Sequence, residues 1–157
     1  MRNTTLCYIH HQGKTLLLHR VKKENDLNKD KWIGVGGGFE DKESPEDCLL
    51  REVLEETGLT LTRYAYRGIV TFVSDKWETE YMHLFTADEF VGDLKECDEG
   101  TLEWVPDEVV PTLPTWEGDR IFLNLLERDI PFFSLKLTYT GEKLTGAILN
   151  GKPYKED

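Results

Sequence analysis

Hydrophobic and polar residues alternate over much of the chain with the two-residue period of β-strands. The alternating stretches are short, and turn residues such as Gln12-Gly13 and Thr140-Gly141-Glu142 separate them in the manner of hairpins. The pattern predicts strands at Thr4–His10, Lys14–Arg20, Trp32–Val35, Ile69–Ser74, Tyr81–Ala87, Thr101–Val105, Phe132–Thr140 and Leu144–Leu149.

A helix is predicted from Pro45 to Thr57. Ser44 is a good N-cap, proline suits the first helical position, and Asp47 stands where a capping box places its acid. Gly58 can end the helix because glycine adopts the left-handed backbone conformation without strain.

A second helix is predicted at Thr115–Arg128. Ile121 and Leu125 recur at helical spacing there, and so do Phe122 and Leu126, which gives the segment one apolar face.

The order of these elements predicts an α/β fold in which helices cover a mixed sheet. Between the main elements, we expect a helical turn at Pro106–Val110 and a polar, mobile loop at Lys22–Lys31. A chain of 157 residues most simply forms one domain, here residues 1–157.

Composition narrows the possible partners. The net charge of −11 argues against nucleic-acid binding, which needs a basic surface. Three cysteines, Cys7, Cys48 and Cys97, are too few and too scattered for a disulfide framework or a zinc cluster. Because the sequence shows neither a signal peptide nor a membrane-spanning run, we expect a cytoplasmic protein without a membrane partner.

The helix at 45–57 has an unusual distribution of charge. Its apolar face is expected to consist of Leu49, Leu50, Val53 and Leu54. The neighbouring face carries Glu52, Glu55 and Glu56 within an arc of roughly 100°. Like charges at these spacings destabilise a helix by roughly 0.2–0.5 kcal/mol per pair, and the helix dipole opposes acids near the C-terminus.

Arg51 can pair with Glu55, but one cation cannot balance three acids. Magnesium or manganese could, since hard divalent ions take carboxylate, water and phosphate oxygens as ligands. The alternative for any helix with three glutamates is a solvated charged face.

The stretch around this helix is similar to the Nudix box, Gly-x5-Glu-x7-Arg-Glu-U-x-Glu-Glu-x-Gly-U, where U is a bulky aliphatic residue. A pattern of this length is far less prone to chance matches than a short glycine motif. Its specified positions are filled by Gly37, Glu43, Arg51, Glu52, Val53, Glu55, Glu56, Gly58 and Leu59.

The resemblance implies a Nudix-type α/β/α sandwich in which the box forms a loop, a helix and a second loop. It implies that Arg51 orients the acids of the helix and that Glu43 supports the loop. The implied metal ligands are Glu52, Glu55, Glu56 and the backbone carbonyl of Gly36.

Outside the box, the chain is similar to the MutT-type 8-oxo-dGTP diphosphatases. The matching residues are Lys31-Trp32, Asp98-Glu99, Glu103-Trp104-Val105, Trp116 through Asp119, and Ile130-Pro131-Phe132-Phe133.

This second resemblance implies further site residues. Glu99 is the candidate for an additional metal ligand or base, and Asp98 is its nearest rival. Trp116 would stack on a purine and Asp119 would hydrogen-bond to it, while Lys23 could touch phosphate. The alternatives are an exposed loop acid at 99, a core tryptophan at 116 and a solvated lysine at 23.

Two departures concern base selectivity. Those relatives have an asparagine that contacts the base where this chain has Ile33, and isoleucine has no side-chain hydrogen bond to offer. They also have a lysine where this chain has Gly38.

The sequence therefore favours a metal-dependent nucleoside triphosphate pyrophosphohydrolase that clears oxidised purine nucleotides such as 8-oxo-dGTP. The expected cofactor is Mg²⁺, for which Mn²⁺ can substitute, and the expected products are a nucleoside monophosphate and pyrophosphate. The enzyme would work as a monomer or a homodimer. Three alternatives stay open: a Nudix hydrolase of ADP-ribose, a dinucleoside polyphosphate or another linked diphosphate; a non-catalytic nucleotide sensor; and a diphosphate isomerase, for which Cys48 is not convincingly placed.

Overall fold

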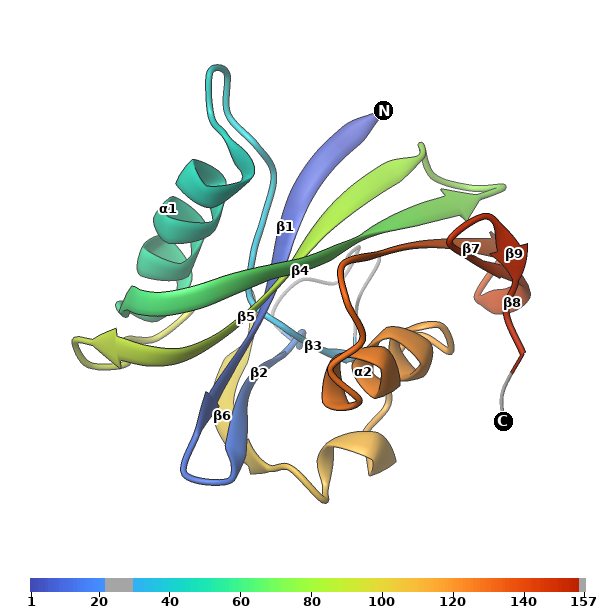
Figure 1. The fold of residues 1–157 in the computed structure, drawn as a ribbon. Coiled ribbons are helices and arrows are strands. Elements are labelled where there is room, and N and C mark those ends of the chain that lie inside the picture. The colour runs from blue at the N-terminus through green and yellow to red at the C-terminus, as the bar shows by residue number, and fades with distance from the viewer. Residues whose placement is uncertain (22–29, 156–157) are drawn as a thin grey trace.

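The computed structural model describes residues 1–21 and 30–155 (Figure 1). In chain order the elements are β1 (Arg2–His11), β2 (Lys14–His19), β3 (Trp32–Ile33), α1 (Pro45–Thr57), β4 (Thr60–Ser74), β5 (Glu80–Val91), β6 (Thr101–Pro106), the 3₁₀ turn η1 (Val110–Thr112), α2 (Asp119–Glu127), β7 (Phe133–Thr140), β8 (Lys143–Leu149) and β9 (Lys152–Pro153). The expected loop at Lys22–Lys31 falls largely on residues 22–29, which lie outside the described part of the chain.

The strands form one mixed sheet, as predicted. Its order is β3-β2-β1-β5-β4-β7-β8-β9, and β6 pairs with β2. The β1–β5 and β4–β7 pairs are parallel, while the other pairs are antiparallel. The parallel pairs join strands that are far apart in the sequence, so they place residues from distant segments side by side.

Two helices cover opposite faces of this sheet (Figure 1). The alternation along β1 shows how: Tyr8 belongs to the hydrophobic core beneath α2, whereas Cys7 and Ile9 belong to the core beneath α1. Successive side chains of a strand point to opposite faces, so each central strand contributes to both cores. The arrangement is the predicted α/β/α sandwich.

Helix α1 begins and ends at the predicted residues. The Ser44 side chain accepts a hydrogen bond from the Asp47 N–H at 3.0 Å, and Asp47 accepts one from the Ser44 N–H at 3.0 Å. Gly58 follows the helix with a φ of 82°. The helix that carries the acidic face is thus held at both ends by local contacts.

The apolar face of α1 differs from the prediction. Leu49 and Val53 are completely buried, but Leu50 and Leu54 are 36% and 49% exposed. The buried stripe instead includes Cys48 and Thr57, because the helix packs on the sheet along the line of residues 49, 53 and 57.

Strands β4 and β5 are longer than predicted, since the sequence indicated only Ile69–Ser74 and Tyr81–Ala87. Irregular register between Leu61 and Gly68 interrupts the alternation in β4. A β-bulge shifts which residues face the core, and this shift hides the strand from a two-residue pattern.

Strand β3 ends at Ile33 and not at Val35, because the chain turns there into the glycine loop (residues 34–38). The other corrections concern the second half of the chain. Helix α2 begins at Asp119 and not at Thr115, because the preceding residues form a turn in which the Asp119 N–H bonds to the Trp116 carbonyl. The helical turn expected at Pro106–Val110 lies later, at Val110–Thr112.

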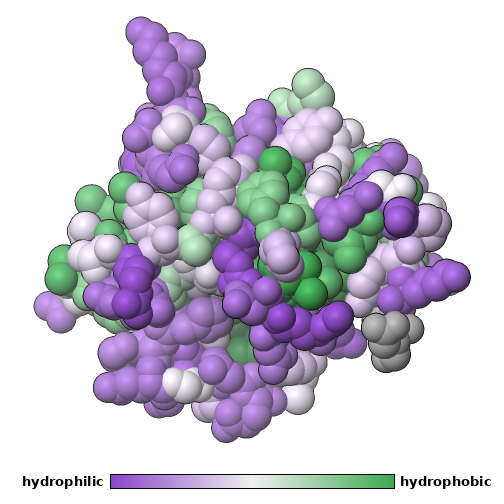
Figure 2. All heavy atoms as spheres, viewed as in Figure 1, coloured by the Kyte–Doolittle hydropathy of each residue, from purple (hydrophilic) through white to green (hydrophobic). Residues whose placement is uncertain are grey.

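The polarity of the surface and the state of the cysteines agree with what the composition indicated. Hydrophilic side chains cover most of the face shown in Figure 2, with hydrophobic ones gathered beside its centre. Cys7, Cys48 and Cys97 are buried free thiols. Among the described residues, neither helix has the length and apolar character to cross a membrane. That residues 1–157 form one domain stays a prediction.

We predict that Gly58→Ala destabilises the protein more than Gly141→Ala. Both glycines have a left-handed backbone, with φ values of 82° and 60°, and that strain alone amounts to about 1 kcal/mol in each variant. At Gly58 the new Cβ would also lie 2.6 Å from the Asp93 carbonyl oxygen, whereas at Gly141 nothing lies within 4 Å. Equal losses in free energy of unfolding, measured by urea denaturation, would contradict the steric explanation.

Candidate active site

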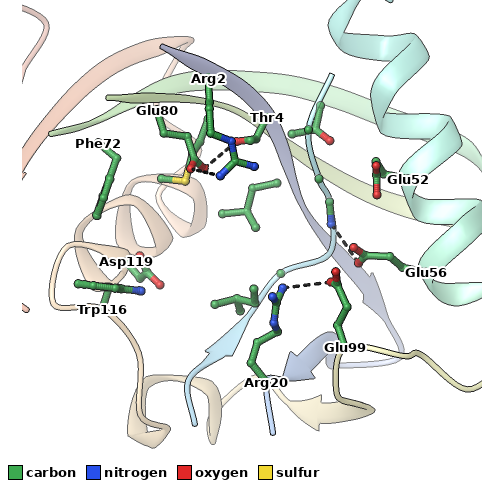
Figure 3. A pocket seen from close by; sticks show the side chains of 18 of the residues that line it. Arg2, Thr4, Arg20, Glu52, Glu56, Phe72, Glu80, Glu99, Trp116 and Asp119 are labelled. Carbon is green, nitrogen blue, oxygen red and sulfur yellow. Dashed lines mark hydrogen bonds and ion pairs between the residues drawn. The ribbon is translucent and has the colours of Figure 1, made fainter. Parts of the chain in front are cut away.

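A pocket of about 330 Å³ opens where the glycine loop, α1 and the start of α2 meet the sheet (Figure 3). Glutamates gather on one side of it, and an aromatic wall with a buried carboxyl forms the other. Its charged lining residues are Arg2, Arg20, Glu52, Glu56, Glu80, Glu99 and Asp119.

The acidic side is built on α1. Glu52 and Glu56 stand one helical turn apart and both line the pocket. The Glu56 carboxylate accepts a hydrogen bond from the Gly36 N–H at 3.4 Å. Burial first, and then the nearby charges of Glu99 and Glu52, together raise the pKa of Glu56 to about 8.

The glycine loop approaches both the sheet and α1 too closely for any side chain. A Cβ on Gly36 would lie 1.9 Å from the Thr5 carbonyl oxygen, and a Cβ on Gly37 would lie 2.5 Å from the Glu52 carboxyl. Glycine is therefore needed at position 36, where the backbone of Thr5 is in the way, whereas a Cβ at position 37 would displace the Glu52 carboxyl.

Arg51 ties this loop to the helix. Its Nε and Nη2 bind the two oxygens of Glu43 at 2.7 and 2.8 Å, and Nη2 also donates to the Gly38 carbonyl at 2.9 Å. Nη1 binds Glu52 at 2.7 Å and Glu55 at 3.3 Å. The hydrogen bonds from Arg51 lower the pKa of Glu43 to about 2. The predicted Arg51–Glu55 pair is thus present, together with shorter bonds to Glu43 and Glu52.

Glu55 differs from the other two acids of the helix. Its side chain is 58% exposed, and it is not among the described residues that line the pocket. The acids that the structure brings together are Glu52, Glu56 and Glu99.

Glu99 reaches the pocket from the loop before β6. It forms an ion pair with Arg20 at 3.1 Å, which Figure 3 shows across the lower part of the pocket. Glu99, rather than its neighbour Asp98, lines the pocket. Lys23, the predicted phosphate contact, lies outside the described residues.

The donor chemistry of the acidic side fits a hard divalent cation. Within residues 1–21 and 30–155, no three Asp, Glu, His or Cys side chains are arranged to hold a metal ion as they stand, and one oxygen of Glu52 is turned toward Arg51. Glu52 and Glu99 nevertheless lie close enough to Glu56 to raise its pKa through their charges. An oxygen-binding cation would relieve that repulsion.

The opposite side of the pocket is aromatic. Trp116 is only 6% exposed and packs edge-on against Phe72 and Tyr139, with ring centroids 5.6 and 5.1 Å apart. The Lys31 ammonium lies 4.5 Å from the centre of the Trp116 ring. Trp116 is therefore a core residue that also forms part of the pocket wall. Its stacking on a purine stays a prediction.

Asp119 is the buried carboxyl beside this wall, at the first position of α2. Burial raises its pKa to about 7, although the charge of Lys31 acts in the opposite direction. A carboxyl with this pKa changes between hydrogen-bond donor and acceptor near neutral pH. Ile33 also lines the pocket; the resemblance implies an asparagine that contacts the base at this position.

Sequence reasoning missed the basic residues of the pocket, Arg2 and Arg20, and the acid Glu80. Each of these side chains belongs to an alternating strand or its end, and the same pattern would suit an ordinary surface charge. The pairing of distant strands brings these side chains to the pocket, and no local sequence pattern indicates that position.

The chain is similar to known proteins over most of its length. The sequence profile of the NUDIX domain matches residues 1–126. An uncharacterised Nudix hydrolase of Bacillus subtilis, YvcI, is 29% identical over 147 residues, which cover 90% of this chain and 89% of that protein. The oxidized purine nucleoside triphosphate hydrolase of Danio rerio is 32% identical over 124 residues, covering 78% and 77% of the two chains. The crystal structure of a MutT protein from Bacillus halodurans superposes with a TM-score of 0.85 at 26% identity, covering 98% of this chain and 100% of that one.

We predict that Glu56→Gln lowers turnover about 100-fold or more, because it removes a charged oxygen ligand from the acidic side. The same change should stabilise the metal-free protein. The folded state keeps a proton on Glu56 from pH 4.5 to about 8, where the unfolded state has released it. Stability therefore falls as pH rises through this range, and the glutamine variant escapes the loss.

At pH 8 in chelator, we expect Glu56→Gln to exceed wild type by on the order of 3 kcal/mol in free energy of unfolding, with the difference vanishing near pH 4.5. Glu108→Gln, a change at an exposed loop acid, is the matched control and should change neither quantity. Near-normal turnover, or a stability difference independent of pH, would contradict the assignment of Glu56.

We predict that Arg51→Lys raises the Mg²⁺ concentration for half-maximal activity by about 10-fold or more, since lysine keeps the charge but lacks the fork that holds Glu43, Glu52 and the Gly38 carbonyl together. Arg63→Lys is the control, because Arg63 forms its ion pairs with Asp88 and Glu89 on the surface. A lower melting temperature with an unchanged Mg²⁺ midpoint would show that Arg51 serves the fold alone.

Proposed function

The chain belongs to the Nudix hydrolase family, and on this basis we propose that it is a metal-dependent nucleoside triphosphate pyrophosphohydrolase that clears oxidised purine nucleotides such as 8-oxo-dGTP. Its products would be the nucleoside monophosphate and pyrophosphate. It would act in the cytoplasm, as a monomer or a homodimer.

One observation carries the proposal: a single pocket combines an aromatic end that holds a buried carboxyl with an end rich in carboxylates. Trp116 and Asp119 form the first, and Glu52, Glu56 and Glu99 form the second. An aromatic ring stacks on any base, while a carboxyl at the base edge distinguishes one base from another. The carboxylates at the other end would repel a phosphate chain unless cations lie between them.

Nudix hydrolases generally use divalent metal ions. We assign Mg²⁺ to the acidic side, where Glu52, Glu56, Glu99 and the carbonyl of Gly36 would hold it and the exposed Glu55 could join them. When bound, the ion supplies positive charge to the phosphate oxygens and lowers the pKa of water.

The protein's own groups position the reactants. Arg51 fixes Glu52 and the glycine loop relative to each other. Arg20, within 3.1 Å of Glu99, places a positive charge on the pocket wall near the expected phosphates. One of the glutamates of the acidic side would take the proton of the attacking water.

A nucleotide screen tests the proposal. Wild-type protein with Mg²⁺ should release pyrophosphate from 8-oxo-dGTP faster than from dGTP or dATP. Faster turnover of ADP-ribose, a GDP-sugar or a dinucleoside tetraphosphate would favour a Nudix hydrolase of another linked diphosphate. Tight nucleotide binding without turnover of any substrate would indicate a sensor.

We predict that Asp119→Asn changes the ranking among purine triphosphates, whereas Glu56→Gln depresses all of them by a similar factor. Metal ligands act on the phosphates that every substrate shares, while a carboxyl at the base edge meets atoms that differ between bases. The wild-type ranking should also change between pH 6 and pH 8, as Asp119 loses its proton around pH 7, and the asparagine variant should lose this dependence. The measurement is kcat/KM for 8-oxo-dGTP, dGTP and dATP at both pH values.

If Asp119→Asn instead scales every substrate by one factor at both pH values, the proposed base contact is wrong. The pocket would then select its substrate through phosphate and sugar.

A further inference from the structure

A second polar group faces the pocket, apart from Asp119 and from the acidic side. It consists of Arg2, Thr4 and Glu80, which Figure 3 shows together at the upper edge of the pocket. Arg2 and Thr4 lie on β1 and Glu80 begins β5, and the parallel pairing of these strands places Arg2 directly beside Glu80.

The Glu80 carboxylate is held in place. Its Oε2 accepts a hydrogen bond from the buried Thr4 hydroxyl at 2.9 Å, and its Oε1 lies 3.4 Å from Arg2 Nη1. The Glu80 side chain is only 16% exposed. A carboxylate fixed by two donors presents its remaining lone pairs in a defined direction.

The guanidinium of Arg2 also reaches the glycine loop. Its Nη2 lies 3.8 Å from the point where a Cβ on Gly38 would stand. Because Gly38 has no side chain, the Arg2 guanidinium can occupy this edge of the pocket. The pocket therefore presents a hydrogen-bond donor, Arg2, immediately beside an acceptor, Glu80.

This pair matches one edge of an oxidised purine. An ordinary purine has an acceptor at N7 and a C–H group at position 8. Oxidation at C8 places a proton on N7 and a carbonyl oxygen on C8, so the same edge carries a donor beside an acceptor. A carboxylate accepts from the N7–H of the oxidised base and repels the N7 lone pair of the ordinary one, while a guanidinium donates to the C8 oxygen.

We propose that Arg2 and Glu80 read the imidazole edge of the base and select purines oxidised at C8, an inference that rests on the proposed function. Glu80 accepts from N7–H and Arg2 donates to the C8 oxygen, with Thr4 as the positioning residue for Glu80. Asp119 then reads a different part of the base. The division predicts that Glu80 discriminates oxidised from ordinary purines whether the base is guanine or adenine.

The test measures kcat/KM for two substrate pairs, 8-oxo-dGTP with dGTP and 8-oxo-dATP with dATP. In Glu80→Gln the amide oxygen can still accept from Thr4, which leaves the amide nitrogen free to donate to an ordinary N7. We expect the preference for the oxidised member of both pairs to fall by about 10-fold or more. Arg2→Met should lower the same preference by a smaller factor, because Arg2 is half exposed. Glu78→Gln is the matched control, since Glu78 is a nearby exposed acid that pairs with the chain's N-terminus.

A binding measurement separates this inference from the proposed function. Quenching of the intrinsic tryptophan fluorescence, to which Trp116 in the pocket wall contributes, by 8-oxo-dGMP and by dGMP reports base preference without hydrolysis. If no triphosphate is turned over but the binding preference depends on Glu80, the proposed function fails and the inference holds. If triphosphates are turned over and Glu80→Gln leaves both oxidised-to-ordinary ratios unchanged, the inference is overturned alone. A wild-type enzyme without preference for oxidised bases in either assay would also overturn it.

Discussion

The fork of hydrogen bonds made by Arg51 is the contact on which the acidic side of the pocket depends. Its guanidinium joins the glycine loop, through Glu43 and the Gly38 carbonyl, to the helix face that carries Glu52. Without this fork, the loop and the acids of α1 would retain longer contacts, such as the 3.4 Å hydrogen bond from the Gly36 N–H to Glu56. The close approach of Gly36 to the sheet requires a position without a side chain, and a Cβ at Gly37 would displace the Glu52 carboxyl, so the motif works as one unit of arginine, glycines and acids.

The same unit concentrates negative charge in a chain that already carries a net charge of −11. Burial and neighbouring acids raise the pKa of Glu56 to about 8, and burial raises that of Asp119 to about 7. Both groups therefore oppose folding at neutral pH unless a proton, a cation or a ligand accompanies them. Clusters of perturbed groups in one pocket are typical of functional sites, and here they stand at the two ends of a cavity whose proposed substrate has an anionic chain and a polar base.

The sheet determines how these ends face each other. Side chains that alternate along β1 contribute to the cores beneath both helices, and this leaves α1 and α2 on opposite faces. The pocket opens where the start of α2 and the glycine loop meet the same strands. Pairing of β1 with β5 then places Arg2 beside Glu80 at its edge, which adds a charged pair that neither helix supplies.

The sequence by itself determined the features that depend on neighbouring residues. The bounds of α1 follow from Ser44, Asp47 and Gly58, whose caps involve contacts within a few positions, and the box spacing identified the family. The mixed sheet between helices also followed from the order of periodic segments. The carboxylates proposed to bind metal came from the resemblance, and the structure brings Glu52, Glu56 and Glu99 to one pocket while leaving Glu55 exposed.

Tertiary structure decided what depends on distant pairing. Leu50 and Leu54 share the predicted apolar arc, but the line along which α1 packs on the sheet leaves them exposed. Bulges in β4 removed the alternation that would have revealed its full length. Arg2 and Glu80 are 78 positions apart, and no local pattern contains their contact, because parallel pairing is selected by the packing of the whole sheet. Local chemistry thus specified the helix and its acids, while long-range packing decided which side chains meet in the pocket.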